Sequence, residues 1–191
     1  MKIIVKYIII MLILLLFLFQ NINAQETTQT IILKEGFNFV SFTVVPQINA
    51  QQLLLQYLPI DDIYYYNAAA GSFLSCKEGG LSSLGSGKGY IIKSKAQIDI
   101  TLAGEPVLSA VDISLKPGFN LVGFSQICGK TKFKNFVEKS NKIKGIYKWN
   151  SASGSFIQVL RNSTSSTVEL IDGVDPEISA GFSYFINVAQ E

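Results

Sequence analysis

The sequence contains few of the side chains that catalyse reactions. It has no histidine, so the commonest general base and zinc ligand is missing. Its two cysteines, Cys76 and Cys128, have no histidine partner that would make either of them a nucleophile. In the stretch GSGKGY at 85–90, a glycine follows the lysine, where a phosphate-binding loop needs Ser or Thr. The sequence therefore predicts no catalytic residue, no metal site and no cofactor.

Paired carboxylates are the remaining catalytic alternative, because two of them can hydrolyse a glycosidic bond. Asp61 and Asp62 are adjacent, and adjacent side chains on a strand point to opposite faces. Asp172, Asp175 and Glu177 surround a turn and lack the regular oxygen-ligand spacing of a calcium loop. We expect a protein that is not an enzyme, and a small carboxylate-dependent hydrolase is the alternative hypothesis.

Aromatic side chains are the best candidates for binding. Flat exposed rings flanked by hydrogen-bonding groups suit sugars, and the candidates are Tyr64, Tyr65, Tyr66 and Trp149. Tyr64 and Tyr66 alternate along one strand face, as do Tyr147 and Trp149. We expect this face to be core, because large rings supply most of the apolar burial in a small domain. Tyr65 is on the other face and is the candidate for a stacking contact.

The rings belong to a repeated sequence. The stretches LKEGFNFVSF and LKPGFNLVGF are identical at seven of ten positions. Three blocks recur in the same order, at 33–42 and 115–124, 65–73 and 148–156, and 87–93 and 179–185. Duplication of one unit explains such a pattern. It predicts two tandem homologous modules, at 30–104 and 111–191.

Each module is expected to be a small antiparallel sheet or barrel with one short helix, so the fold class is mainly β with minor α. The Lys-Glu-Gly turn at 34–36 predicts a hairpin between the strands on either side of it. The alternating segments 88–93 and 97–102 predict two strands paired with each other.

Four polar residues are expected to organise these modules. Asn49 and Thr131 precede short apolar patterns of helical spacing and are predicted N-caps. Asn38 and Asn120 follow the same aromatic residue in the two copies. We expect both to be buried and hydrogen-bonded to the backbone of a neighbouring loop.

The first 24 residues differ from the rest. Lys2 and Lys6 precede an apolar run of 13 residues at 7–19, and the small residue Ala24 ends the segment. These are the parts of a secretory signal peptide, and the run is shorter than the roughly 20 residues that span a bilayer. The sequence predicts a cleaved signal peptide at 1–24, with an uncleaved anchor as the alternative. The mature chain is then secreted to the extracellular space or cell surface, or to the periplasm of a Gram-negative cell.

Removal of this segment leaves fourteen basic and fourteen acidic residues. A net charge of zero offers no bulk attraction to nucleic acid or an anionic membrane. An oxidising compartment permits a disulfide between Cys76 and Cys128, and two free thiols are the alternative. Asn162 begins an Asn-Ser-Thr acceptor that would be glycosylated only in a eukaryote.

The repeat resembles tandem modules of secreted and surface bacterial proteins. Such modules open with Gly-aromatic-Asn-Leu-Val-Ser, carry a Trp on a middle strand and close with a Gly-Tyr strand. The matching positions are 36–41, Tyr66 and Gly89-Tyr90 in the first copy, and 118–123, Trp149 and Gly181-Phe182 in the second. The resemblance implies an extracellular accessory module without catalytic residues.

We therefore expect a secreted, non-catalytic binding or adhesion module, with carbohydrate as the candidate ligand class. Its expected partner is an extracellular glycan or protein, with no nucleic acid, and with membrane contact only through the signal segment before cleavage. The alternatives are the hydrolase described above and a structural subunit that oligomerises through exposed edge strands.

Overall fold

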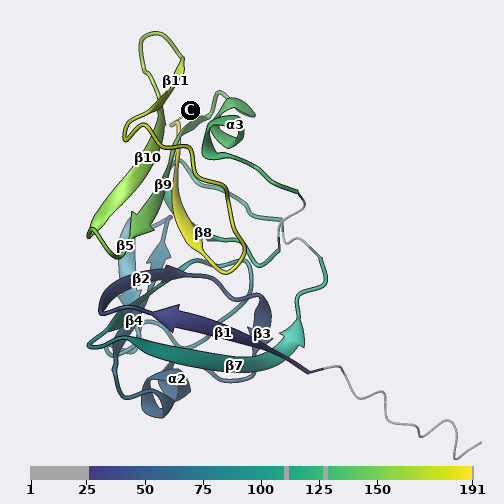
Figure 1. Ribbon diagram of the computed structural model, residues 1–191, viewed down its shortest axis with the longest axis vertical. Coiled ribbons are helices and arrows are strands. Elements are labelled where there is room, and N and C mark those ends of the chain that lie inside the picture. Colours follow the sequence, from purple (N-terminus) through teal and green to yellow (C-terminus); the bar gives the residue numbers. More distant parts are fainter. Residues whose placement is uncertain (1–25, 110–111, 127–128, 191) are drawn as a thin grey trace, which may run out of the picture.

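The computed structural model describes residues 26–109, 112–126 and 129–190, and it confirms a mainly β fold with minor helix (Figure 1). The predicted signal peptide at 1–24 lies outside the described residues. The described chain forms three antiparallel sheets and two short helices, α2 (Ala50–Gln56) and α3 (Phe133–Glu138). In Figure 1, α2 lies at the lower end of the molecule and α3 near the upper end.

The first half of the chain forms two sheets around one core. Its strands are β1 (Thr27–Leu33), β2 (Gly36–Val40), β3 (Val44–Pro46), β4 (Ile60–Asn67), β5 (Ser72–Ser75), β6 (Tyr90–Ser94) and β7 (Ile98–Pro106). The order is β1-β7-β3 in one sheet and β2-β6-β4-β5 in the other. Leu33, Ile63 and Ile100 come from both sheets and meet Leu53 of α2 in a single buried cluster. This shared core, which excludes water, joins the two sheets into one unit.

The second half forms one five-stranded sheet covered by α3. Its strands are β8 (Gly118–Gly123), β9 (Ile143–Asn150), β10 (Ser155–Arg161), β11 (Val168–Leu170) and β12 (Ser183–Val188). The order is β11-β10-β9-β12-β8. Phe133 of α3 is fully buried against Ile146 and Tyr184 of this sheet.

The two halves share one strand arrangement. The order β2-β6-β4-β5 corresponds strand for strand to β8-β12-β9-β10. The registers also agree, since Tyr66 pairs with Phe73 as Trp149 pairs with Phe156. Residues at the same register position in the two sheets are called equivalent below. Within the described ranges, the β1-β7-β3 sheet belongs to the first half alone and β11 to the second half alone.

Equivalent asparagines hold equivalent turns, as predicted. The Oδ1 of Asn38 accepts the backbone N–H of Lys34, and its Nδ2 donates to the carbonyl of Lys34. Asn120 makes the same two bonds with Lys116. Both asparagines are buried. Their prediction as structural residues is confirmed, because each satisfies backbone groups that would otherwise be buried without a partner.

The predicted hairpin around residues 34–36 is wrong. Strand β1 pairs with β7, whereas β2 pairs with β6 in a different sheet. The predicted pairing of 88–93 with 97–102 fails for the same reason, because β6 and β7 belong to different sheets. Each turn carries the chain from one sheet to the other across the core. Alternation and turn residues locate strands, but they do not say which strand is the partner.

Of the two predicted helix caps, one is confirmed. Asn49 caps α2 by accepting the N–H of Gln52, whose side chain accepts the N–H of Asn49. The prediction of Thr131 as an N-cap is wrong. The N-cap position of α3 is the next residue along the chain, and the side chain there makes no capping hydrogen bond. The carboxylate of Asp175, on a distant loop, accepts the N–H of Lys134 in the first turn instead. A cap supplied from far along the chain leaves no local sequence pattern.

The third repeated block aligns two residues away from its predicted position. The register places Tyr90 opposite Val40 and Tyr184 opposite Val122, so the two tyrosines are equivalent. Both rings are fully buried, and each hydroxyl accepts a backbone N–H five residues earlier, from Gly85 and Ser179. The Phe182 position is therefore equivalent to Lys88, not to Tyr90.

Alkaline pH is expected to destabilise the fold through Tyr90. Burial of its hydroxyl raises the pKa of Tyr90 from 10.0 to about 12. Because the folded state favours the neutral hydroxyl, this group stabilises the fold fully below pH 10. The stabilisation is lost as pH rises toward 12. Urea unfolding should show the free energy of unfolding falling by about 2 kcal/mol over this window. Tyr90→Phe should reduce this fall in the free energy of unfolding with pH. An unchanged fall would show that another group causes it.

Candidate functional site

The two halves meet through an aromatic junction. The indole of Trp149 stacks on Phe39, with ring centroids 5.6 Å apart and planes 26° apart, and its N–H donates to the carbonyl of Phe37 at 2.7 Å. Tyr66 of the first half meets Phe185 of the second edge to face at 5.4 Å. These rings lie on the sheet faces that point away from the two cores.

This arrangement corrects the predicted orientation of the aromatic face. Tyr64 and Tyr66 were expected in the core of the module, but that core instead holds Ile63 and receives Tyr65, which packs beside Tyr90. The rings of this face are partly buried, and the other half of the chain covers them in place of the module's own core. A sequence pattern within one module cannot reveal a face that packs against its sister module.

Backbone contacts at the junction follow a pseudo-two-fold pattern. Val40 forms a β-bridge with Phe182, and the equivalent Val122 forms one with Lys88. Exchanging the two halves therefore converts one bridge into the other. The N–H of Ser41 donates to the carbonyl of Gly181 at 2.9 Å, alongside the first bridge. The halves are thus joined by hydrogen bonds as well as by ring packing.

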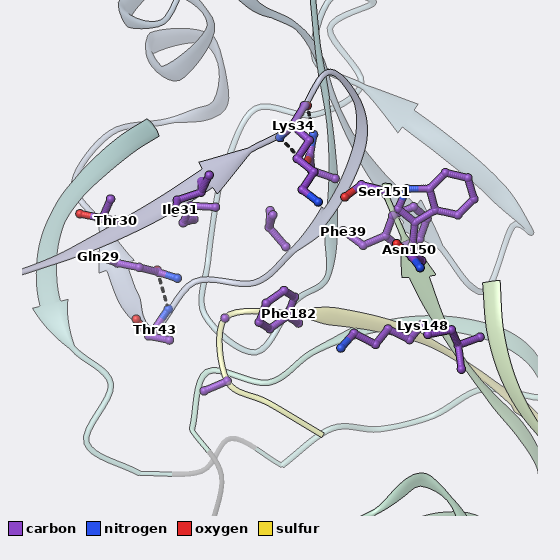
Figure 2. A pocket seen from close by; sticks show the side chains of 17 residues that line it. Gln29, Thr30, Ile31, Lys34, Phe39, Thr43, Lys148, Asn150, Ser151 and Phe182 are labelled. Carbon is purple, nitrogen blue, oxygen red and sulfur yellow. Dashed lines mark hydrogen bonds between the residues drawn. The ribbon is translucent and has the colours of Figure 1, made fainter. Parts of the chain in front are cut away.

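One cleft opens beside each bridge. The first cleft, shown in Figure 2, has a volume of about 770 Å³. It is lined by 29–32, Lys34, 38–40, Thr43, 148–151, Ile157 and 180–182. The Phe182 ring lies between Gln29 and Thr43 on one side and Lys148 on the other (Figure 2). Phe182 is 47% exposed, and the Lys148 Nζ lies 5.3 Å from its ring centroid.

The wall of the first cleft is held in place by hydrogen bonds. The amide of Gln29 donates to the carbonyl of Ser41 and accepts the N–H of Thr43, so both of its ends are fixed. Lys34 and Lys148 contribute positive charge, and the lining contains no Asp or Glu. The cleft therefore combines a flat ring, hydroxyl groups and excess positive charge.

The second cleft is the pseudo-symmetric counterpart of the first. It has a volume of about 350 Å³ and is lined by 65–69, 86–88, 112–116 and 120–122. Here the Lys88 Nζ lies 5.6 Å from the Tyr65 ring. Tyr65 is equivalent to Lys148 and Lys88 to Phe182, so ring and cation have exchanged positions while the cation–π pair is kept. Unlike the first cleft, this one also contains a carboxylate, Asp112.

A third hollow, the aromatic groove, lies between the two sheets. Its volume is about 510 Å³, and its lining is Ile91 together with seven rings, those of Phe37, Phe39, Tyr64, Phe73, Trp149, Phe156 and Phe185. Phe39 and Trp149 also line the first cleft, so their stacked rings form the wall between the two.

The residues predicted from the sequence fall into three different places. Trp149 lines the first cleft and the aromatic groove, Tyr64 lines the groove, and Tyr65 and Tyr66 line the second cleft. Sequence reasoning did not find Phe182, which carries the most exposed ring of the first cleft. The exchanged positions of ring and cation in the two copies would indicate Phe182. They can be seen in the sequence only when Tyr90 is aligned with Tyr184.

The candidate catalytic groups have structural contacts. Hydrogen bonds from Lys77 and Lys93 hold the pKa of the Asp61 carboxyl far below its usual range, so Asp61 cannot serve as a general acid near neutral pH. Asp62 is buried and accepts hydrogen bonds from the Ser75 hydroxyl and from two backbone N–H groups. Asp172 accepts the N–H of Gln158 on the adjoining strand.

Cys76 is a buried free thiol, and burial raises its pKa, which opposes formation of the nucleophilic thiolate. Its proposed disulfide partner, Cys128, lies outside the described residues. Over the ranges that the structure describes, no group of three or more Cys, Asp or Glu side chains is placed to hold a metal ion. Neither α2 nor α3, the helices of that part of the chain, has the length and apolar character to cross a bilayer.

Comparison with protein-family models, with curated proteins and with solved structures gave no match to this chain, so its function is inferred from the geometry of the clefts themselves.

Proposed function

We propose that the protein is a secreted, non-catalytic binding module that takes an acidic glycan in the first cleft. The signal-like segment at 1–24 supports export, and the fixed aromatic cleft at the junction supports binding. The observation that carries the proposal is the half-exposed Phe182 ring, set among polar side chains in a hollow of about 770 Å³. Ligand sites of small molecules have volumes of roughly 300–1,000 Å³.

Phe182 gives the cleft a surface on which a sugar can stack. The face of an aromatic ring is electron-rich, and the C–H groups on one face of a pyranose are weakly positive. Trp149 adds a second ring at the wall of the same cleft, and its stacking on Phe39 fixes its position. Rings that are fixed before binding lose little conformational entropy when a ligand arrives.

The charge of the cleft selects among glycans. Lys34 and Lys148 are the charged residues of its lining. A carboxylate or sulfate on the sugar would compensate them, and Ser151 in the same lining carries a hydroxyl that can bond to a sugar hydroxyl. Uronic-acid or sulfated oligosaccharides therefore fit better than neutral ones. Exposed charges are screened by salt, so affinity should fall as ionic strength rises.

Calorimetric titration of the chain from Gln25 onward tests this proposal. Acidic oligosaccharides should bind, and neutral ones of equal length should bind more weakly. Phe182→Ala should weaken binding about tenfold or more, because it removes the stacking surface. Lys148→Gln should weaken binding less and reduce its salt dependence. Phe119→Ala is the control, because its ring is 43% exposed and lies outside the first cleft.

Two results would contradict the proposal. One is the absence of binding to every acidic oligosaccharide tested. The other is unchanged binding by Phe182→Ala, which would place any glycan site elsewhere on the molecule.

A further inference from the structure

We infer that the aromatic groove is a separate binding site, which takes an apolar ring system carrying one negative charge. The site is independent of the glycan proposal, although Phe39 and Trp149 form a common wall with the first cleft. Its chemistry differs from that of the first cleft, because the only polar side-chain groups of its lining are the Tyr64 hydroxyl and the Trp149 indole N–H.

The groove exposes rings that a folded protein would normally cover. Phe37 is 43% and Phe73 is 50% exposed, and both line the groove. Contiguous exposed apolar surface of this kind marks sites of interaction. A bound ring system would stack on, or meet edge to face, the rings that surround it, and it would remove apolar surface from water.

One of the differences between the two halves leaves space in the groove. Ile91 lines the groove, and its equivalent in the second half is Phe185. Phe185 reaches across the junction, with its ring 6.0 Å from Phe119 and 5.4 Å from Tyr66, and it also lines the groove. Isoleucine has no ring that could make such contacts on the side that carries Phe37. At Ile91 the groove is therefore lined by a smaller side chain than the ring at the equivalent position of the second half.

Positive charge at the rim of the groove indicates the charge of the ligand. Lys93 pairs with Phe37 across β6 and β2, and its Nζ lies 6.0 Å from the Phe37 ring centroid. Lys93 belongs to a cluster in which Lys77, Lys93 and Lys95 all contact the single carboxylate of Asp61. Three ammonium groups around one carboxylate leave excess positive charge, which an anionic group on the ligand would compensate.

Two fluorescent probes of similar shape test both parts of the inference. Anilinonaphthalene sulfonate is aromatic and anionic, whereas N-phenylnaphthylamine is aromatic and neutral. The folded chain from Gln25 should bind both, and the sulfonate more tightly. Phe37→Ala should weaken both about tenfold, because it removes one wall of the groove. Ile91→Phe should abolish binding of both by filling the space. Lys93→Gln should weaken the sulfonate several-fold and leave the neutral probe within about twofold.

Phe119→Ala is the matched control, because Phe119 is equivalent to Phe37, has the same 43% exposure and lies outside the groove. It should bind both probes as the unaltered chain does. Equal losses in Phe37→Ala and Phe119→Ala would overturn the inference, as would full binding by Ile91→Phe with unchanged near-ultraviolet circular dichroism. An equal response of the two probes to Lys93→Gln would refute the anionic preference. None of these substitutions alters Phe182 or Lys148, so glycan binding is scored separately.

Discussion

Gly123→Ala is expected to lower the free energy of unfolding by about 3 kcal/mol or more, which corresponds to a fall in Tm of about 6–12 °C. A Cβ at this position would lie 2.1 Å from the carbonyl oxygen of Lys88 and 2.4 Å from the Ser41 Oγ. The first of these neighbours is backbone of the other half, so it cannot rotate away. The substitution must push the two halves apart where their strands meet, next to the bridge between Val122 and Lys88.

Gly85→Ala is the control for this experiment. A Cβ on Gly85 meets nothing within 4 Å, so only a small change in stability is expected. Thermal and urea denaturation of both variants measure the difference. Equal stability of the two variants would mean that the halves do not approach each other closely at Gly123.

Phe185→Ala should have the second largest effect, a loss of about 3 kcal/mol. The Phe185 ring contacts rings from both halves, including Phe39 and Tyr66 of the first and Phe119 of the second, at centroid distances of 5.4–6.0 Å. Its removal leaves a cavity at the centre of the junction, and the surrounding rings are held by their own sheets.

Phe73→Ala serves as the comparison, because the Phe73 ring is half exposed and already borders the open groove. It should cost less than about 1 kcal/mol. Urea denaturation followed by the single tryptophan reports on the junction directly, since Trp149 lies in it. If both substitutions cost the same, Phe185 is not central to the contact between the halves.

The repeated sequence predicted more of the sheets than of their assembly. Aligning the blocks correctly matched Tyr64 with Tyr147 and Tyr66 with Trp149, because strand residues and turn residues recur in each copy. Strand partners were missed, since the turn after Leu33 leads into a different sheet. Local patterns specify where a strand runs, but partner choice depends on the packing of distant segments.

The candidate site was only partly accessible to sequence reasoning. Trp149 was predicted as a binding residue and lines the first cleft, yet Phe182, Lys148 and Gln29 were not singled out. These side chains meet only because the two halves associate through their outer sheet faces. The aromatic face was assigned to the core because a single module offers no other place to bury large rings.

Binding of an acidic glycan in the first cleft can be followed through the indole N–H resonance of Trp149. The chain has one tryptophan, so this signal is unique, and the group lies at the wall of the cleft. Titration with an acidic oligosaccharide should shift it together with the amide signals of 180–182, and Phe182→Ala should abolish these shifts. Shifts confined to 65–69 and 86–88, with the Trp149 signal unmoved, would show that the glycan binds in the second cleft and not in the first.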